Sequence, residues 1–330
     1  MEIKKWTALL LCIILCIGSI PISCNAATKK TSGTDGNGNT WVYDVKTKTL
    51  TFSGNKGIED FIMDGHIPEP GWYVWNTKAE HIMINDGITE IGIGAFDGFI
   101  NVKTVTMADS VTHIKSGAFI FCRNLTSVKL SAKVKCIEGD AFYGCERLKH
   151  LTLPDTLKTL GTLGACLKLK EVIIPDSVSK TNKNLFYECK SLTKIKLPRN
   201  MKEIKQYDFA NCKNLRTLEI PEAVTTVSMS AFAGTKLKRI TLPKNVTTIK
   251  KGMPYGGKGK VFAVNYNWDL PTRDLRLIEI KSKKVKSIAK GSFSGLSSKV
   301  VIKVPKSRKK KYTKMLRKSG LEKKVKIRTL

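Results

Sequence analysis

The fold is decided by the stretch Leu192-Thr193-Lys194-Ile195-Lys196-Leu197-Pro198, followed by Ile204 and by Phe209-Ala210-Asn211-Cys212. The same order of residue types returns about every 23 residues and can be written L-x-x-I-x-I-P-x-x-V-x-x-I-x-x-x-A-F-x-x-C-x-x. A fixed period in this range is typical of solenoids, in which each repeat forms one coil. The units begin at Ala79, Val102, Leu125, Leu148, Leu169, Leu192, Leu215, Leu237, Leu275 and, in broken form, Lys299.

Each unit carries three groups of apolar residues, which we interpret as three walls of one coil. The first group alternates with polar residues, which predicts a strand with one face inward. A proline follows this strand in several units, where it fixes φ and removes a hydrogen-bond donor. In the unit from Leu125 the three groups are Leu125, Val128 and Leu130, then Val134 and Ile137, then Phe142 and Cys145. We therefore predict a β-rich solenoid of about ten coils with an aromatic stack along its axis.

A single coil buries too little apolar surface to fold alone, so the array needs several units and covered ends. We expect residues 27–78 to form an N-terminal capping segment. It contains a β-hairpin of Trp41-Val42-Tyr43 and Thr49-Leu50-Thr51-Phe52, and Trp72, Tyr73 and Trp75 act as a lid. The solenoid itself spans residues 79–298, with an insert at 251–274.

Residues 299–330 are predicted to form a basic C-terminal cap made of a broken coil, a helix and a final strand. Ser307 after Pro305 is a candidate N-cap, and Gly320 ends the helix. Tyr312, Met315 and Leu316 fall on one helix face, and Val325 and Ile327 alternate with lysines.

The first 26 residues have the order of a secretory signal peptide. Lys4 and Lys5 precede an apolar run from Trp6 to Ile20, followed by a short polar stretch. Two alternatives stay open: a lipoprotein modified at Cys24, and an uncleaved anchor helix. The signal-peptide interpretation predicts a secreted or cell-surface protein with no membrane-spanning segment in the mature chain.

The chain is strongly basic, with a formal net charge of +31. Such a surface attracts polyanions. For an exported protein these are wall polymers, acidic polysaccharides, anionic lipid surfaces and extracellular nucleic acid, and charge alone does not choose among them. Basic density peaks in residues 299–330, which hold fourteen Lys or Arg and one acid, Glu322.

Five cysteines recur at the spacing of the repeat, namely Cys122, Cys145, Cys166, Cys189 and Cys212. Regular spacing places one cysteine at the same corner of successive coils, which favours core packing over disulfide bridges. Cys136 lies off this series and is expected to be a free thiol.

These residues resemble the BspA-like leucine-rich repeat family of bacterial surface and secreted proteins over nearly the whole mature chain. The Trp41 hairpin is similar to that family's entry segment and the Pro305 helix to its usual ending. The resemblance implies a binding protein, and some relatives act as adhesins for host matrix or other bacteria. Three features depart from the pattern: Leu163 replaces a phenylalanine, Thr181 occupies an apolar slot, and the insert at 251–274 adds residues. We expect the coils of Leu163 and Thr181 to be looser.

No motif of catalysis, cofactor binding or metal binding is found. The four histidines lack metal spacing or a nucleophile beside them. Gly256 to Lys260 lacks the spacing of a phosphate loop and is interpreted as a flexible basic loop. Asp35 to Asn39 lacks the closing glutamate of an EF-hand and is interpreted as a linker. We therefore predict that the protein is not an enzyme and uses no cofactor or metal.

Two surfaces are candidates for binding. The first is the outward side of the strands, which at about 4.8 Å per coil is about 45 Å long. The second is the insert, whose aromatics suit sugar stacking or a protein contact, although they also suit plugging a gap beside a degenerate coil. The candidate residues are Lys129, His150, Lys194, Lys196 and Arg239 on the strands and Tyr255, Phe262, Tyr266 and Trp268 in the insert.

The preferred hypothesis is a secreted or cell-surface protein that binds a macromolecule, either a host or bacterial surface protein or a glycan. A second hypothesis is a structural protein held to anionic wall polymer by charge. No specific binding to nucleic acid is predicted. An exported hydrolase with an unrecognised site is a third hypothesis, but the acids at the strand face are interleaved with lysines, which disfavours it.

Overall fold

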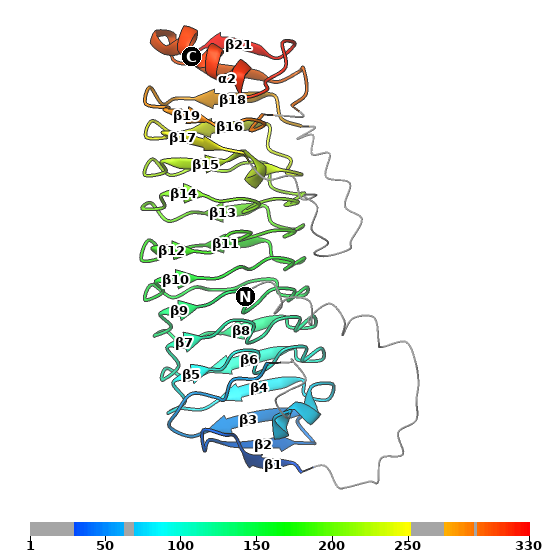
Figure 1. Ribbon diagram of the computed structural model, residues 1–330. Coiled ribbons are helices and arrows are strands. Elements are labelled where there is room, and N and C mark those ends of the chain that lie inside the picture. The colour runs from blue at the N-terminus through cyan, green and yellow to red at the C-terminus, as the bar shows by residue number, and fades with distance from the viewer. Residues whose placement is uncertain (1–29, 63–68, 252–273, 294–295) are drawn as a thin grey trace.

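The computed structural model describes residues 30–62, 69–251, 274–293 and 296–330 and consists of an elongated stack of about ten coils (Figure 1). This architecture confirms the predicted β-solenoid with little helix. The predicted signal peptide lies outside the described residues, as does the insert apart from its two end residues. The boundaries of the capping segments at 27–78 and 299–330 stay predictions.

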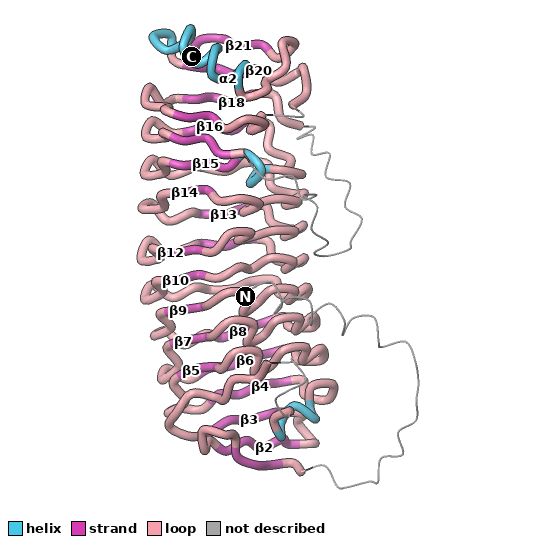
Figure 2. The backbone as a smooth tube through the Cα atoms, viewed as in Figure 1, coloured by secondary structure: helices cyan, strands magenta, loops and turns pink. Residues whose placement is uncertain are grey.

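Most coils contribute one short strand to each of two parallel ladders that run along the stack (Figure 2). The first ladder contains β4 (His81–Ile84), β6 (Thr104–Met107), β8 (Ser127–Lys129), β11 (Glu171–Ile173), β13 (Lys194–Lys196), β16 (Arg239–Leu242), β18 (Leu277–Ile280) and β20 (Val301–Val304). The second ladder contains β5 (Glu90–Ile91), β7 (His113–Ile114), β9 (Cys136–Ile137), β10 (Thr159–Leu160), β12 (Lys180–Thr181), β14 (Glu203–Ile204), β15 (Thr226–Ser228), β17 (Thr248–Lys250) and β19 (Ser287–Ile288).

Both ladders are interrupted, and at different levels. The first ladder lacks a strand in the coil from Leu148, where only the bridge between His150 and Glu171 is formed, and in the coil from Leu215. The second ladder is interrupted between β12 and β14. The coil that contains Leu163 thus lacks a strand in the first ladder, and the coil of Thr181 has a strand in each ladder but does not pair with the next coil in the second. That these two coils are looser stays a prediction.

The interior is a continuous apolar core that contains residues from all three groups of the repeat, with a few members of the first group, such as Leu130 and Ile195, only partly buried against it. Phe96, Phe119 and Phe142 stack nearly parallel, with ring centroids 5.2 and 5.3 Å apart. A second run joins Phe186, Phe209 and Phe232 at 6.1 and 6.3 Å. The predicted aromatic stack therefore exists, but buried Leu163 divides it into two runs.

The five periodic cysteines are buried free thiols, as their spacing predicted. Each thiol donates a hydrogen bond of 3.1–3.3 Å to a main-chain carbonyl of the preceding coil; Cys145, for example, donates to Phe119. Burial raises the pKa of these thiols, to about 12 for Cys166. They are therefore part of the core and the contacts between coils, and their thiolates are not available for chemistry.

The N-terminal end is covered by an antiparallel sheet that continues into the first ladder. The predicted hairpin is formed by β2 (Thr40–Asp44) and β3 (Thr49–Ser53), and β3 pairs in parallel with β4. A third strand, β1 (Ser32–Thr34), was not predicted. The segment interpreted as a linker is instead a tight turn in which the buried Asp35 carboxylate accepts hydrogen bonds from three main-chain amides. The 3-10 helix η2 (Gly71–Trp75) buries its three aromatic residues as a lid.

The C-terminal end is closed by a short helix and a last strand. The helix α2 (Lys309–Lys318) follows η4 (Lys306–Arg308), and β21 (Lys326–Thr329) pairs in parallel with β20. Tyr312 is buried, and its hydroxyl donates to the carbonyl of Ser282 and accepts from the amide of Val285, both at 3.0 Å. The prediction for Ser307 was wrong: it lies within η4, and α2 begins without a side-chain cap because the chain enters it through that 3-10 turn.

A further 3-10 helix, η3 (Met229–Phe232), lies in the coil from Leu215. The described part of the chain contains no helix with both the length and the apolar composition that crossing a bilayer requires.

Candidate binding surface

The outward side of the first ladder, here called the strand face, is formed by residues that alternate with the buried core. In β4 and β6 the buried residues are Ile82, Ile84, Val105 and Met107, so the residues between them point outward. Parallel pairing in register then aligns outward residues of neighbouring coils into columns. One column runs through Thr51, Met83, Thr106 and Lys129, and another through Thr49, His81, Thr104 and Ser127.

The N-terminal half of the strand face is almost uncharged. Its columns consist of threonine, serine, histidine and methionine until they reach Lys129. His81 Nδ1 lies 2.8 Å from the hydroxyl of Thr104, which fixes the orientation of the imidazole. Met83 is 44 % exposed between these polar neighbours. This half therefore offers hydroxyl groups and one apolar side chain to a ligand.

The C-terminal half of the strand face carries charge of both signs. Lys194 lies 2.6 Å from the carboxylate of Glu171 on the neighbouring strand. Lys196 is in register with Ile173, which is 54 % exposed. Farther on, the hydroxyl of Thr241 donates to Glu279 at 3.2 Å. A ligand that contacts this half meets lysines with acidic and apolar neighbours.

The structure places the predicted strand residues on one surface. Lys129, Lys194, Lys196 and Arg239 are exposed residues of β8, β13 and β16, and exposed His150 forms the bridge in the coil without a strand. The strand face is less regular than the alternation predicted, because the coils from Leu148 and Leu215 form no strand in the first ladder. The four insert residues, Tyr255, Phe262, Tyr266 and Trp268, lie outside the described residues.

His81 and Met83 are not among the strand residues chosen from the sequence, of which Lys129 comes first, although the pattern His-Ile-Met-Ile in residues 81–84 has the same alternation. In the structure the strand face begins two coils before Lys129 and is joined to the hairpin strand β3.

Carboxyl groups with raised pKa do not converge in the described part of the chain. Burial raises the pKa of Asp97 and of Asp208 to about 7 in each case and also raises the pKa of Asp140, but the three residues lie in separate coils. Asp208 is fully buried and accepts hydrogen bonds from two main-chain amides. Within the same ranges, no group of three or more potential ligands is arranged to hold a metal ion.

A stack of about ten coils of this length, with leucine-type residues pointing inward and strand ladders on its sides, defines a leucine-rich repeat solenoid. The family model described as BspA type leucine rich repeat region, with six copies, matches residues 72–164 and 163–256, which is more than half of the chain. The chain therefore belongs to the BspA-type leucine-rich repeat family, as the resemblance in its repeats predicted.

Solved structures of bacterial leucine-rich repeat proteins have a similar fold. One, from Eubacterium ventriosum, is 22 % identical, covers 91 % of this chain and 85 % of its own, and has a TM-score of 0.50. Another, from Bacteroides ovatus, is 21 % identical, covers 88 % and 77 %, and has a TM-score of 0.51. No curated protein matches the chain. These likenesses concern the fold alone.

Proposed function

We propose that this protein is secreted or displayed at the cell surface and binds a macromolecular ligand through its strand face. The observation that carries the proposal is the register of the first ladder, which aligns exposed side chains of successive coils into columns. An extended set of fixed columns suits a protein or glycan surface better than a small molecule, because many weak contacts are made at once. Adhesion to host matrix or to other bacteria is the role that fits best.

Binding rather than catalysis is supported by two observations. The raised-pKa carboxyls Asp97 and Asp208 lie in separate coils, and the carboxylate of Glu171 is paired with Lys194. The family is also one of bacterial surface repeat proteins, which supports an extracellular location. The signal-like residues 1–26 point the same way.

The experiment is a binding array of purified matrix proteins and glycans, probed with variants that change one half of the strand face at a time. Met83→Lys with Thr106→Lys places two charges in the uncharged half, and Lys196→Glu with Arg239→Glu reverses two charges in the other. All four residues point outward, so the core is not altered. Thr159→Lys with Thr226→Lys on the second ladder is the matched control.

We expect one half of the strand face to dominate, so that its variant loses at least about tenfold in affinity for the captured ligand while the control keeps it. A protein lacking residues 252–273 tests the alternative surface predicted from sequence. If neither pair of substitutions on the strand face weakens binding, the proposal is wrong, and loss on deletion of the insert then assigns binding to that segment.

A further inference from the structure

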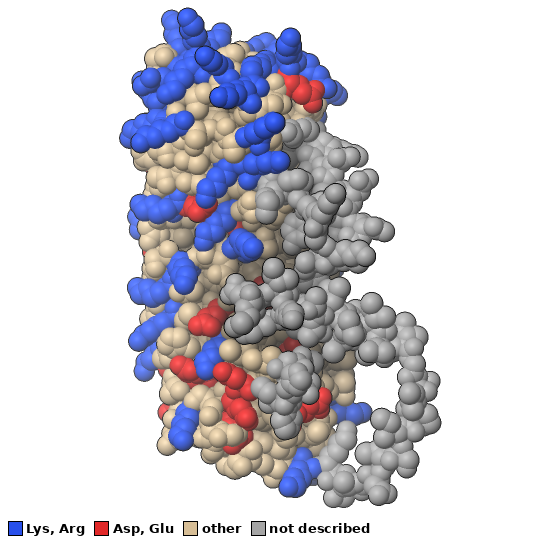
Figure 3. Space-filling model, viewed as in Figure 1, with Lys and Arg blue, Asp and Glu red and all other residues tan. Residues whose placement is uncertain are grey.

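Charge is distributed very unevenly along the solenoid. Residues 31–110 contain five Lys or Arg and eleven Asp or Glu, whereas residues 281–330 contain nineteen Lys or Arg and one acid, Glu322. Figure 3 shows the acidic side chains gathered over the N-terminal coils and the basic ones crowded at the opposite end. The molecule therefore has an acidic end and a basic end, and positive charge is densest at the latter.

The basic side chains of the C-terminal end are not neutralised by protein carboxylates. Ion pairs are spread over the earlier coils, for example Lys194 with Glu171 and Lys250 with Glu203. Within residues 296–330 the ion pair is Lys324 with Glu322, and Arg317 donates hydrogen bonds to main-chain carbonyls of residues 321–325. The exposed lysines of the helix α2 make no ion pair with the described residues, so they repel one another and remain available to an external anion.

The way the helix α2 packs decides which side chains face outward. Tyr312 and Leu316 are buried against the last coils, so the lysines of the helix point to solvent. Lys309, Lys310, Lys311 and Lys314 are all exposed. The outward residues Lys326 and Arg328 of β21 are also exposed on the last strand.

A membrane surface is a poor match for this end. An interfacial helix binds a bilayer by inserting its apolar face, and here that face is occupied by the protein core. Leu321 and Val325 are buried as well, and Leu330 is the one large hydrophobic residue that is well exposed in the described residues after 274. Attraction without apolar insertion favours a polymer in solution or in a wall.

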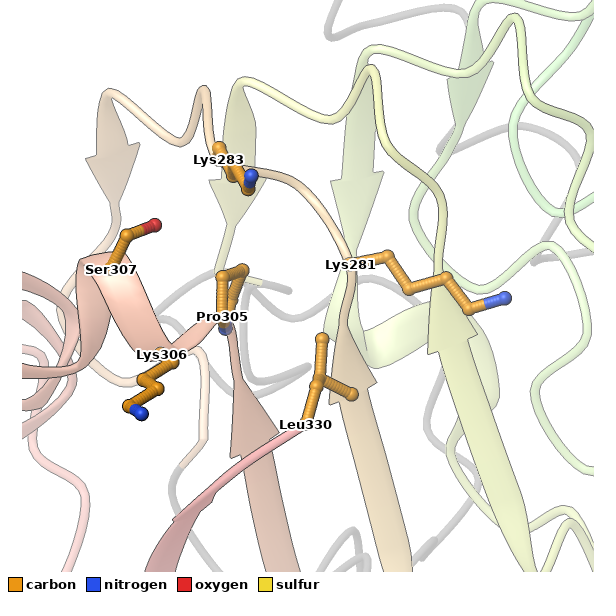
Figure 4. Close-up of a pocket in the computed structure, with 6 residues that line it drawn as sticks. All are labelled: Lys281, Lys283, Pro305, Lys306, Ser307 and Leu330. Atoms are coloured by element: carbon orange, nitrogen blue, oxygen red, sulfur yellow. The ribbon is translucent and has the colours of Figure 1, made fainter.

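The pocket at this end does not form a site for a single anion. It has a volume of about 550 Å³ and lies between the last coils and the start of η4. Figure 4 shows that the side chains of Lys281, Lys283 and Lys306 extend in different directions rather than converging. Cations that spread over a surface suit a chain of many charges better than one phosphate group.

We propose that the basic end of the solenoid docks a linear polyanion with closely spaced charges, and that this contact orients the protein with its acidic N-terminal end outward. The contact is made by exposed lysines of α2 and the last strand. It is independent of the ligand of the strand face, so either proposal can fail alone. The uncharged half of the strand face then lies toward the outer end, away from the polymer.

The test compares two fourfold variants with the same net charge. Lys309→Gln, Lys310→Gln, Lys311→Gln and Lys314→Gln remove four charges from the basic end. Glutamine is about as good a helix former as lysine. The control replaces four exposed lysines of the middle coils that have no ion pair, Lys133, Lys149, Lys158 and Lys168, with glutamine. Far-UV circular dichroism and thermal unfolding verify that both variants stay folded.

Binding to inorganic polyphosphate is measured over a range of salt concentrations. We expect log Ka of the wild type to fall linearly with log salt, and the basic-end variant to lose up to about 3 from that slope and at least about tenfold in affinity. The control loses much less. Equal losses in both variants would mean that only net charge matters and would overturn the proposal.

Two further probes separate the other classes of partner. If phosphatidylglycerol vesicles bind more tightly than polyphosphate at the same concentration of negative charge, the basic end is a membrane-binding surface. Single-stranded DNA that binds more tightly at equal charge would require base contacts. Either result overturns the proposal, and similar binding of DNA and polyphosphate with weaker binding of vesicles supports it.

Discussion

Asp208 makes the stability of the solenoid depend on pH, with a sign and size that follow from its position. It stands where four other coils have alanine immediately before the stacked phenylalanine: Ala95, Ala118, Ala141 and Ala231. Its side chain is fully buried, and its oxygens accept hydrogen bonds from the amides of Leu185 at 3.3 Å and Lys205 at 2.6 Å. Burial raises the pKa of this carboxyl from 3.8 to about 7, because its effect is larger than the opposing effect of the two amide hydrogen bonds.

A raised pKa means that the folded protein holds this proton up to about pH 7, whereas the unfolded chain releases it near 3.8. The stabilisation is therefore present at low pH and is lost as pH rises through the folded value. Between the unfolded pKa of 3.8 and the folded pKa of about 7, each pH unit lowers the free energy of unfolding by about 1.4 kcal/mol. This single group therefore lowers the free energy of unfolding by about 2.5 kcal/mol between about pH 5 and about pH 8.

The substitution Asp208→Ala restores the residue that the repeat uses elsewhere and removes this dependence. We expect the stability of the wild type relative to the variant to be about 2.5 kcal/mol greater at pH 5 than at pH 8. The two amide hydrogen bonds favour the ionised carboxylate and already oppose the effect of burial in the folded pKa of about 7, so they add nothing further to this difference. Urea unfolding followed by far-UV circular dichroism at both pH values measures it.

Asp155→Ala is the control, because it replaces an exposed aspartate of a turn by alanine without altering the core. If the free-energy difference between wild type and Asp208→Ala is the same at both pH values, then burial does not raise the pKa of this carboxyl and the reasoning is refuted.

Three other predictions concern the core and the C-terminal closure. Phe142→Ala removes the end of the first aromatic run and should cost about 3–5 kcal/mol in urea unfolding, whereas Phe121→Ala, whose ring is only partly buried, should cost less. Tyr312→Phe removes the hydroxyl that bonds Ser282 and Val285 and should cost about 1–3 kcal/mol, measured as faster hydrogen exchange in the last coils; unchanged exchange would contradict the bonding of that hydroxyl. Among the described cysteines, only Cys136 should react with iodoacetamide in the native protein, as mapped by mass spectrometry, and labelling of Cys166 before unfolding would contradict its burial.

The period and the core of this fold were predictable because the same side chains return to the same interior wall in every coil. Leu125, Phe142 and Cys145 are buried for this reason, and their spacing alone indicates it. Strand interruptions were harder to predict, since pairing depends on the neighbouring coils. The unit from Leu148 is two residues short, but the shortening lies between Leu160 and Cys166, and residues 150–153 alternate normally. The residues 216–220 alternate normally, and nothing in them predicts the missing strand.

The strand face was predictable in its chemistry but not in its extent. Alternation around Val128 or Ile195 indicates which residues point outward, and Lys129 and Lys194 do so. The start of the face at His81 depends on pairing with the hairpin strand β3, which is a contact between distant segments. The turn at Asp35 was misinterpreted because its order comes from hydrogen bonds across the cap, and composition alone does not reveal them.

The interruptions of the two ladders never fall at the same level. Where β8 of the first ladder has no partner in the next coil, β9 and β10 of the second ladder pair. Where β12 and β14 of the second ladder do not pair with each other, β11 and β13 of the first ladder do. Past β13, the pairs from β14 to β15 and from β15 to β17 carry the connection. Every two neighbouring coils in the described residues are therefore joined by strand hydrogen bonds in at least one ladder. Stretching the solenoid along its axis must break such hydrogen bonds wherever two coils separate.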